Sequence, residues 1–283
     1  MATADAEFEQ STDTVRSADG TTIAYLTVGA GPAVIVVPGA LSVARGYARF
    51  AAALSGRGFT LHTIERRGRG ESGPQGPEYR ITEDCADIRA VRDKTGAGLI
   101  VGHSYGGLVA LEAARDNPDI RKLALYEPGV SIAGSVPSEW MPAYAKYLEQ
   151  GKPFDAFVEF VRAMGPENVR RIPRWMFRRM MPMFMKAPER DLVVGQLAEN
   201  LREHREVVRL NDTYPNYAAV TAEVLLMDGD KDRRPHTDAD HDQLAKTLPH
   251  CERRTLTGLD HFGIDKQAPE LVARFIGEFF SRS

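Results

Sequence analysis

Cysteine is scarce in this chain of 283 residues. The two cysteines, Cys85 and Cys251, are too few for a disulfide scaffold, and whether they pair does not follow from the sequence. No Cys-x-x-Cys motif and no cluster of cysteine and histidine indicates structural zinc, so no metal is expected. A reduced, cytoplasmic protein is therefore the default expectation.

Several other signals are missing as well. No run of 18 apolar residues predicts a membrane span, and the first residues lack the basic start and apolar stretch of a signal peptide. The net charge of -3 gives no electrostatic footprint for nucleic acid. Neither a Rossmann glycine motif nor a P-loop occurs, so no nucleotide cofactor is expected. We expect a small-molecule substrate, with no nucleic acid and no membrane as partner; a homo-oligomer stays open.

Short apolar runs alternate with helical patterns through most of the chain. Continuous apolar runs at Ala33–Val37 and Gly98–Gly102 are typical of strands buried on both faces. Asp19 and Gly20 separate two extended segments and predict a hairpin. The alternation predicts an α/β fold, a mostly parallel sheet with helices on both faces. Further strands are expected at Phe59–Ile64, Lys122–Tyr126, Glu223–Met227 and Glu252–Leu256, and helices at Val43–Leu54, Ile81–Arg92, Leu108–Arg115, Thr237–Thr247 and Pro269–Phe280.

The alternation stops between about Gly129 and Ala219, where helical patterns and prolines dominate. Seven of the nine methionines fall in this segment, where they can fill a core or line a pocket for irregular apolar ligands. We expect a core domain formed by residues 1–128 and 220–283, with residues 129–219 inserted as a helical cap. Its helices are expected at Trp140–Glu149, Pro153–Met164, Arg174–Phe184 and Arg190–Val208.

Residues 102–106 read Gly-His-Ser-Tyr-Gly and follow a buried strand directly. A serine on a sharp strand-to-helix turn needs small neighbours, because the turn is strained and crowded. Such a turn exposes the Ser104 hydroxyl as a nucleophile, and the Tyr105 N–H at the helix start can bind an oxyanion. Gly39 follows another strand and permits close backbone approach, which makes the Ala40 N–H the second oxyanion donor.

A serine hydroxyl needs a base, and the base needs a carboxylate. His261 lies in the loop after the last strand, at the carboxyl edge where α/β sites form, and is the predicted base. Candidate carboxylates follow two other strands, and the residues alone do not choose among them. Those candidates are Asp228, Asp230 and Asp232 after one strand and, as an outside candidate, Glu127 after another.

The order Ser104, Asp232, His261 on these strand ends resembles the α/β-hydrolase superfamily over nearly the whole chain. Residues 229–232 match the Gly-x-x-Asp turn of that family, and residues 258–261 match its Gly-x-x-His loop. The resemblance implies Asp232 as the triad acid. Residues 65–72 are similar to a structural turn of the family, and Pro38 stands where the oxyanion loop of the family usually has histidine.

The resemblance further implies a serine hydrolase without a cofactor, since related epoxide hydrolases and haloalkane dehalogenases carry aspartate in place of Ser104. We expect the substrate to be an ester, lactone or thioester with a medium to bulky apolar part. The predicted cap residues that bind it are Trp175, Met180 and Met181. Acyl transfer, carbon–carbon hydrolysis and perhydrolysis use the same triad, and a non-catalytic receptor on this fold is a further alternative.

Overall fold

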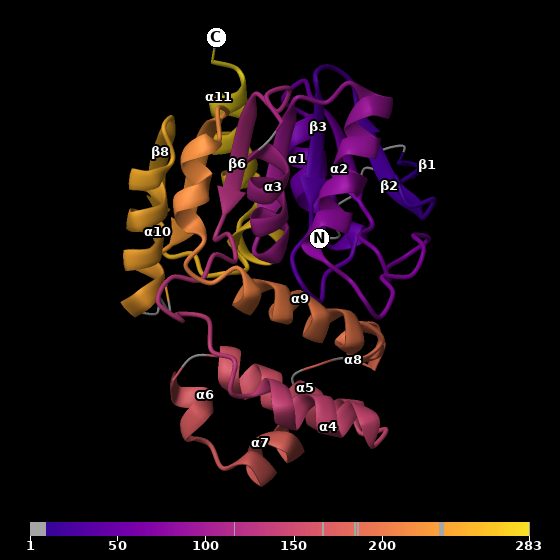
Figure 1. Ribbon diagram of the computed structural model, residues 1–283, viewed down its shortest axis with the longest axis vertical. Coiled ribbons are helices and arrows are strands. Elements are labelled where there is room, and N and C mark those ends of the chain that lie inside the picture. Colours follow the sequence, from indigo (N-terminus) through magenta and orange to yellow (C-terminus); the bar gives the residue numbers. More distant parts are fainter. Residues whose placement is uncertain are drawn as a thin grey trace, which may run out of the picture.

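The computed structural model describes residues 10–115, 117–165, 167–183, 185, 187–231 and 235–282. Its centre is an eight-stranded sheet in the order β1-β2-β4-β3-β5-β6-β7-β8 (Figure 1). The predicted hairpin is confirmed as β1–β2, and β2–β4 is also antiparallel, whereas the other pairs are parallel. The strands are β1 (Ser11–Arg16), β2 (Thr22–Gly29), β3 (Ala33–Val37), β4 (Thr60–Ile64), β5 (Leu99–His103), β6 (Lys122–Tyr126), β7 (Glu223–Gly229) and β8 (Cys251–Leu256).

Helices cover both faces of the sheet, as predicted. The alternation within β3 shows this arrangement, because Ile35 and Val37 join the apolar cluster of one face, and Val34 and Val36 join that of the other. One face is covered by α2 (Ile81–Thr95), α3 (Tyr105–Arg115) and α10 (Pro235–Thr247), and the other by α1 (Ala48–Ser55) and α11 (Pro269–Phe280). Shorter turns are η1 (Ala44–Tyr47), η3 (Tyr214–Ala219) and the π-helical η4 (Gly263–Gln267).

The segment from 129 to 219, which we call the helical insert, is helical as predicted but more broken than its sequence pattern suggests. The pattern Arg190–Val208 is two helices, because the chain turns at Gly195 and Gln196. The short helix α6 had no sequence signal. The insert contains α4 (Met141–Glu149), α5 (Pro153–Met164), α6 (Glu167–Arg171), α7 (Arg174–Met180), η2 (Met181–Met183), α8 (Ala187–Val194) and α9 (Leu197–Arg209).

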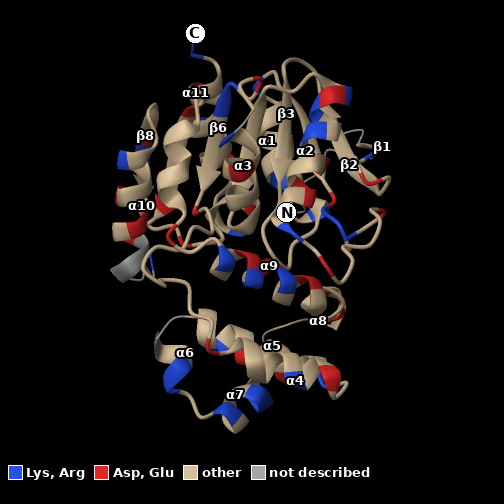
Figure 2. Cartoon of the chain, in the orientation of Figure 1, with Lys and Arg blue, Asp and Glu red and all other residues tan. Residues whose placement is uncertain are grey.

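The helical insert lies beyond the carboxyl ends of the parallel strands. In Figure 1 the arrow of β6 points toward α9, and α4 to α7 lie further from the sheet. The insert has its own apolar cluster around Trp140 and Tyr144, against which Leu41 of the core packs. Residues of both charge signs alternate along α9 (Figure 2). The insert therefore combines an apolar interior with a charged helix next to the core.

Two sequence questions are answered directly by the structure. Cys85 and Cys251 are free thiols, so they form no disulfide with each other. Within the described ranges, none of the helices is long and apolar enough to cross a membrane.

Glycine packing brings the start of α3 against the ends of the neighbouring strands. A Cβ on Gly106 would lie 2.2 Å from the carbonyl oxygen of Val37, and one on Gly102 would lie 2.7 Å from the Cα of Gly107. Gly107 would meet the Cα of Pro128 at 2.9 Å in the same way. Backbone atoms cannot give way as a flexible side chain can. The turn between β5 and α3 therefore requires glycine on both sides of Ser104.

Gly106→Ala should lower the free energy of unfolding by at least the roughly 1–3 kcal/mol typical of overpacking, because the clash is with backbone. Gly46→Ala is the matched control, since a Cβ there meets nothing within 4 Å. Urea unfolding of both variants measures the difference. Equal stabilities would show that the close approach at Gly106 is not needed for the fold.

Candidate active site

Ser104 stands in a left-handed backbone conformation, with φ of 54°. Its N–H donates to the Tyr126 carbonyl at 3.0 Å, and its carbonyl accepts from the N–H groups of Gly107, Leu108 and Gly129. This conformation is strained for a residue other than glycine, so the surrounding hydrogen bonds must hold the Ser104 backbone in place. The strained turn predicted from the glycine pattern is thus present, and it fixes the backbone that carries the hydroxyl.

The two predicted oxyanion donors lie next to this turn. The loop after β3 touches Ser104, because a Cβ on Gly39 would lie 3.1 Å from the Cβ of Ser104. Within the described chain, the N–H groups of Ala40 and Tyr105 donate to no other protein group. Two backbone N–H groups without a protein acceptor, next to a serine hydroxyl, are suited to bind a substrate oxygen that develops negative charge.

His261 forms a hydrogen-bonded pair with a carboxylate. Its Nδ1 lies 2.8 Å from Oε2 of Glu127, which stands at the end of β6. Oε1 of the same carboxylate accepts the Gly229 N–H at 3.0 Å. Burial raises the pKa of Glu127, but the hydrogen bond and charge of His261 outweigh it and hold the pKa below its ordinary value. A carboxylate on Nδ1 leaves Nε2 as the ring atom that takes up a proton.

The other candidate carboxylates have different surroundings. Asp228 is buried and binds Arg253 and His241, and Asp230 accepts the Gly258 N–H at 2.6 Å. Asp232, the acid implied by the family resemblance, lies outside the described residues. Among the described residues, Glu127, the outside candidate of the sequence, is a carboxylate that bonds to His261.

The His103 side chain connects the turn at Ser104 to the loop of His261 through hydrogen bonds. The sequence pattern does not predict this role. Its Nδ1 lies 2.6 Å from the Tyr47 hydroxyl, and its Nε2 lies 2.9 Å from the His261 carbonyl oxygen. The Tyr47 hydroxyl in turn accepts the Gly39 N–H at 3.0 Å. Since a carbonyl only accepts, Nε2 carries the proton and Nδ1 accepts from Tyr47. Burial, with the charge of His261, lowers the pKa of His103 to about 3, so the ring is neutral.

The three predicted substrate-binding residues of the helical insert do not share one environment. Met181 is 4% exposed inside the insert's apolar cluster, and Met180 is half-buried. Trp175 is 70% exposed on α7, away from the sheet (Figure 1). A side chain that faces solvent there does not line a pocket above Ser104 in this conformation, so we leave Trp175 out of the proposed site.

Strained backbone conformations occur at the same groups of the candidate site. Among the described residues, positive φ outside glycine occurs at Leu41, Ser104 and Glu127, and also at Ala133 and Asp212. The first three belong to the loop after β3, the turn between β5 and α3, and the carboxylate bonded to His261. No group of three or more metal-ligating side chains is found in the described part of the chain.

Comparison with known proteins identifies relatives of this architecture. The model of the Alpha/beta hydrolase family matches residues 34–275. An alpha/beta hydrolase structure from Sphaerobacter thermophilus is 29% identical, with a TM-score of 0.79 over 95% of this chain and 100% of that one. The enol-lactonase of Burkholderia xenovorans (21%, TM-score 0.72, 95% and 100%) and an esterase of Exiguobacterium antarcticum (17%, TM-score 0.71, 95% and 99%) share the fold.

The neutral, buried His103 predicts acid-sensitive stability. Unfolded histidine takes up a proton near pH 6.5, whereas folded His103 does so near 3, so the unfolded state binds more protons between these values. Stability should therefore fall from pH 6.5 to 5, by up to about 1.4 kcal/mol per pH unit from this group. In His103→Gln the amide can keep both hydrogen bonds but does not titrate.

The measurement is the free energy of unfolding of both proteins against pH. The slope between pH 6.5 and 5 should be smaller in His103→Gln, and the two curves should run parallel above pH 7.5. Identical slopes at low pH would mean that His103 is not neutral when folded.

Proposed function

Because the chain belongs to the alpha/beta hydrolase family, we propose that it is a serine hydrolase that cleaves a carboxylic ester, lactone or thioester through an acyl-enzyme. One observation carries the proposal. Ser104 stands on a strained turn beside two open backbone donors, and the ring of His261 lies 4.9 Å, centroid to centroid, from the ring of the adjoining His103. The proposed nucleophile, base and oxyanion donors all lie at the carboxyl edge of the sheet, which supports the proposal.

In the proposed first half-reaction, the Ser104 oxygen attacks the substrate carbonyl while Nε2 of His261 takes the hydroxyl proton. The carbonyl oxygen becomes negative and accepts hydrogen bonds from the N–H groups of Ala40 and Tyr105. As the carbon–oxygen or carbon–sulfur bond breaks, His261 returns the proton to the leaving group. The acyl group remains as an ester on Ser104.

In the second half-reaction, water takes the place of the leaving group. His261 removes a proton from the water, and the hydroxide attacks the acyl ester within the same oxyanion donors. Collapse releases the acid and restores the Ser104 hydroxyl. Because the imidazole must be neutral at each attack, activity should require a pH above the pKa of His261.

Two carboxylates are candidates for the third member of the triad. Glu127 is supported by its 2.8 Å contact with Nδ1 of His261 and by its second hydrogen bond to the Gly229 N–H, which orients the carboxylate. Asp232 is supported by its match to the family's turn. We propose Glu127 as the acid and keep Asp232 as the alternative that experiment must exclude.

We further propose that the helical insert is a cap that shapes an apolar substrate site. Its place beyond the strand ends, and the packing of Leu41 against its apolar cluster, support this role. The esterase and the enol-lactonase among the proteins of similar fold agree with the proposed substrate class. A panel of p-nitrophenyl esters, lactones and thioesters, with and without an added alcohol, distinguishes hydrolysis from acyl transfer.

Ser104→Ala and His261→Ala should each abolish turnover, since losses on the order of 10⁶ in kcat follow such changes in a serine-protease triad. A fluorophosphonate probe should label the wild type and not Ser104→Ala. Ser55→Ala, whose hydroxyl bonds only the Ala52 carbonyl on α1, is the control and should label normally. Activity above a few per cent in pure, folded Ser104→Ala would reject the serine mechanism, and an unlabelled wild type would favour a binding protein.

Glu127→Gln should lower kcat by a factor approaching 10⁴, the cost of the equivalent amide change in a serine protease. The amide can still accept the Gly229 N–H, but its NH₂ group facing Nδ1 stabilises the wrong tautomer of His261. Asp232→Asn is the matched variant and should change kcat by less than about tenfold on this mechanism. If Asp232→Asn is the damaging change instead, the family position supplies the acid and Glu127 only supports the loop.

A further inference from the structure

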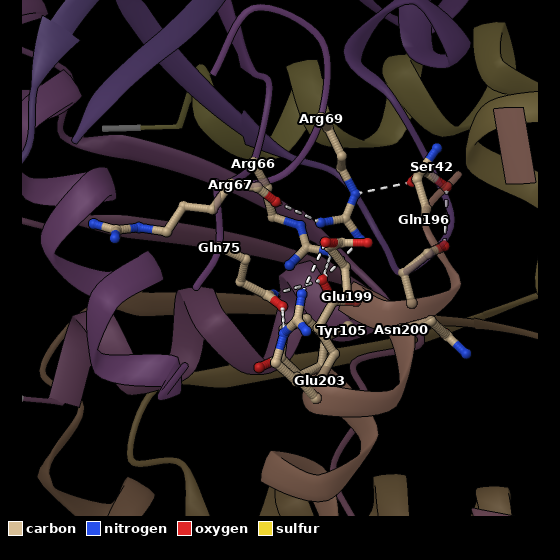
Figure 3. A network of polar contacts seen from close by, with 12 residues as sticks. Ser42, Arg66, Arg67, Arg69, Gln75, Tyr105, Gln196, Glu199, Asn200 and Glu203 are labelled. Carbon is tan, nitrogen blue, oxygen red and sulfur yellow. Dashed lines mark hydrogen bonds and ion pairs between the residues drawn. The ribbon is translucent and has the colours of Figure 1, made fainter. Parts of the chain in front are cut away.

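Arg66 is a fully enclosed guanidinium between the core and the helical insert. Its side chain is 1% exposed, and it lies over the ring of Tyr105, the residue after the nucleophile, at 5.0 Å. Nη1 donates to Asp84 at 3.0 Å. Nη2 reaches two groups, the Gly39 carbonyl at 3.2 Å and Oε1 of Glu203 at 2.9 Å. Figure 3 shows Arg66 and Glu203 side by side. One nitrogen thus joins the oxyanion loop to helix α9.

The bond to Gly39 sets the direction of a neighbouring amide. Gly39 C=O and Ala40 N–H belong to one peptide group, and the described chain contains no cis peptide. In a planar trans peptide the carbonyl and the N–H point in opposite directions. While Arg66 holds the Gly39 carbonyl, the Ala40 N–H points away from Arg66. The preceding peptide is held as well, because the Gly39 N–H donates to Tyr47.

The other partner of this nitrogen belongs to the insert. Glu203 lies on α9, is 0% exposed, and also binds Nη2 of Arg69 at 2.7 Å. Leu41, two residues after Gly39, packs against the apolar cluster of the insert with φ of 54°. The oxyanion loop therefore has two connections to the insert, one ionic through Arg66 and one apolar through Leu41.

Each charge in this group depends on the others. Burial raises the pKa of Glu203, but the charges of Arg66 and Arg69 outweigh it and bring the pKa below its ordinary value. Burial lowers the pKa of Arg66, and the charges of Glu203 and Asp84 reverse that effect. Without Glu203, the buried Arg66 would keep only one of its two carboxylates, Asp84, and its charge would be less well compensated. Displacing α9 would therefore remove one of the two groups that hold Nη2 of Arg66 beside the oxyanion loop.

We infer that Arg66 is a positioning residue, held by Glu203 of α9 and by Asp84 of the core, that keeps the Ala40 N–H aimed as an oxyanion donor while the insert is seated. This inference rests on the proposed function and deepens it. Opening of the insert, as substrate enters or product leaves, would disorganise the donor. Closure would restore it together with the enclosed site.

Arg66→Gln and Arg69→Gln test the inference as a matched pair. Both changes remove a buried guanidinium from Glu203, but Arg69 bonds the Arg67 carbonyl and Gln196 rather than Gly39. With p-nitrophenyl acetate, Arg66→Gln should lower kcat by about 10- to 100-fold, at or below the roughly 100- to 1000-fold loss seen when an oxyanion donor is removed outright, with KM changed less than about threefold. Arg69→Gln should keep kcat within about threefold of wild type.

A trifluoromethyl ketone provides the second readout, because it forms a tetrahedral oxyanion on the serine. Its affinity should fall in Arg66→Gln by the same factor as kcat, and should hold in Arg69→Gln. Equal losses of kcat in both variants, or a loss of melting temperature alone, would overturn the inference. If either glutamine variant fails to fold, Arg66→Lys and Arg69→Lys keep the charge, and the first should again lose more kcat.

Fluorophosphonate labelling of the wild type distinguishes failure of the proposed function from failure of the proposed role of Arg66. An unlabelled, inactive wild type rejects the proposed function. A labelled, active wild type whose folded Arg66 variants turn over at full rate rejects only the role of Arg66.

Discussion

The left-handed backbone at Ser104 is the constraint on which the arrangement of the site depends. It turns the chain sharply between β5 and α3, and Gly102, Gly106 and Gly107 let the surrounding strands approach it. Such a conformation costs on the order of 1–3 kcal/mol, and persists only where neighbours over-determine it. Here four backbone hydrogen bonds do so, and one of them comes from Gly129, the first residue of the insert. The strain therefore indicates a selected geometry, since an ordinary strand-to-helix turn has no need of it.

Stability does not explain the buried charged residues between the core and the insert, because burying them is costly. Arg66, Arg69 and Glu203 are almost completely buried, and taking such charges out of water costs several kcal/mol per ion before their attraction is counted. Apolar side chains of similar volume would hold two layers together at lower cost. An ionic contact is more demanding about geometry, because each donor must meet its acceptor within a few tenths of an ångström. The buried ion pairs therefore fit a role in fixing how the insert sits on the core better than a role in stability.

Local patterns in the sequence predict most of the fold, because each reflects a local cause. Apolar runs mark buried strands, Asp19 and Gly20 mark the hairpin, and glycines flank the strained serine. Within the insert the same approach fails at Gly195, where one apolar pattern continues across a break between α8 and α9. Nor does it choose the partners of the site, since Glu127 is one of several candidate carboxylates and the contacts of Arg66 give no sequence signal. Glu127 meets His261 across 134 positions of sequence, and Arg66 meets Glu203 on a helix of another layer. Pairs of this kind have no periodicity, and they become visible only when the sheet order is known.

Pro38 raises the question of how the loop after β3 is held in place, and the structure answers it. The oxyanion loop of the family usually has histidine there, and proline offers neither a side-chain donor nor a backbone N–H. The loop must then be held from outside. Tyr47 accepts the Gly39 N–H, and Arg66 donates to the Gly39 carbonyl, so both peptide groups that flank Gly39 are fixed by side chains from other elements. Tyr47 is bonded in turn to His103, and His103 to the loop of His261. Contacts that a single histidine could make locally are thus distributed over the turn at Ser104, the loop of His261 and helix α9, so the position of the loop after β3 depends on all three.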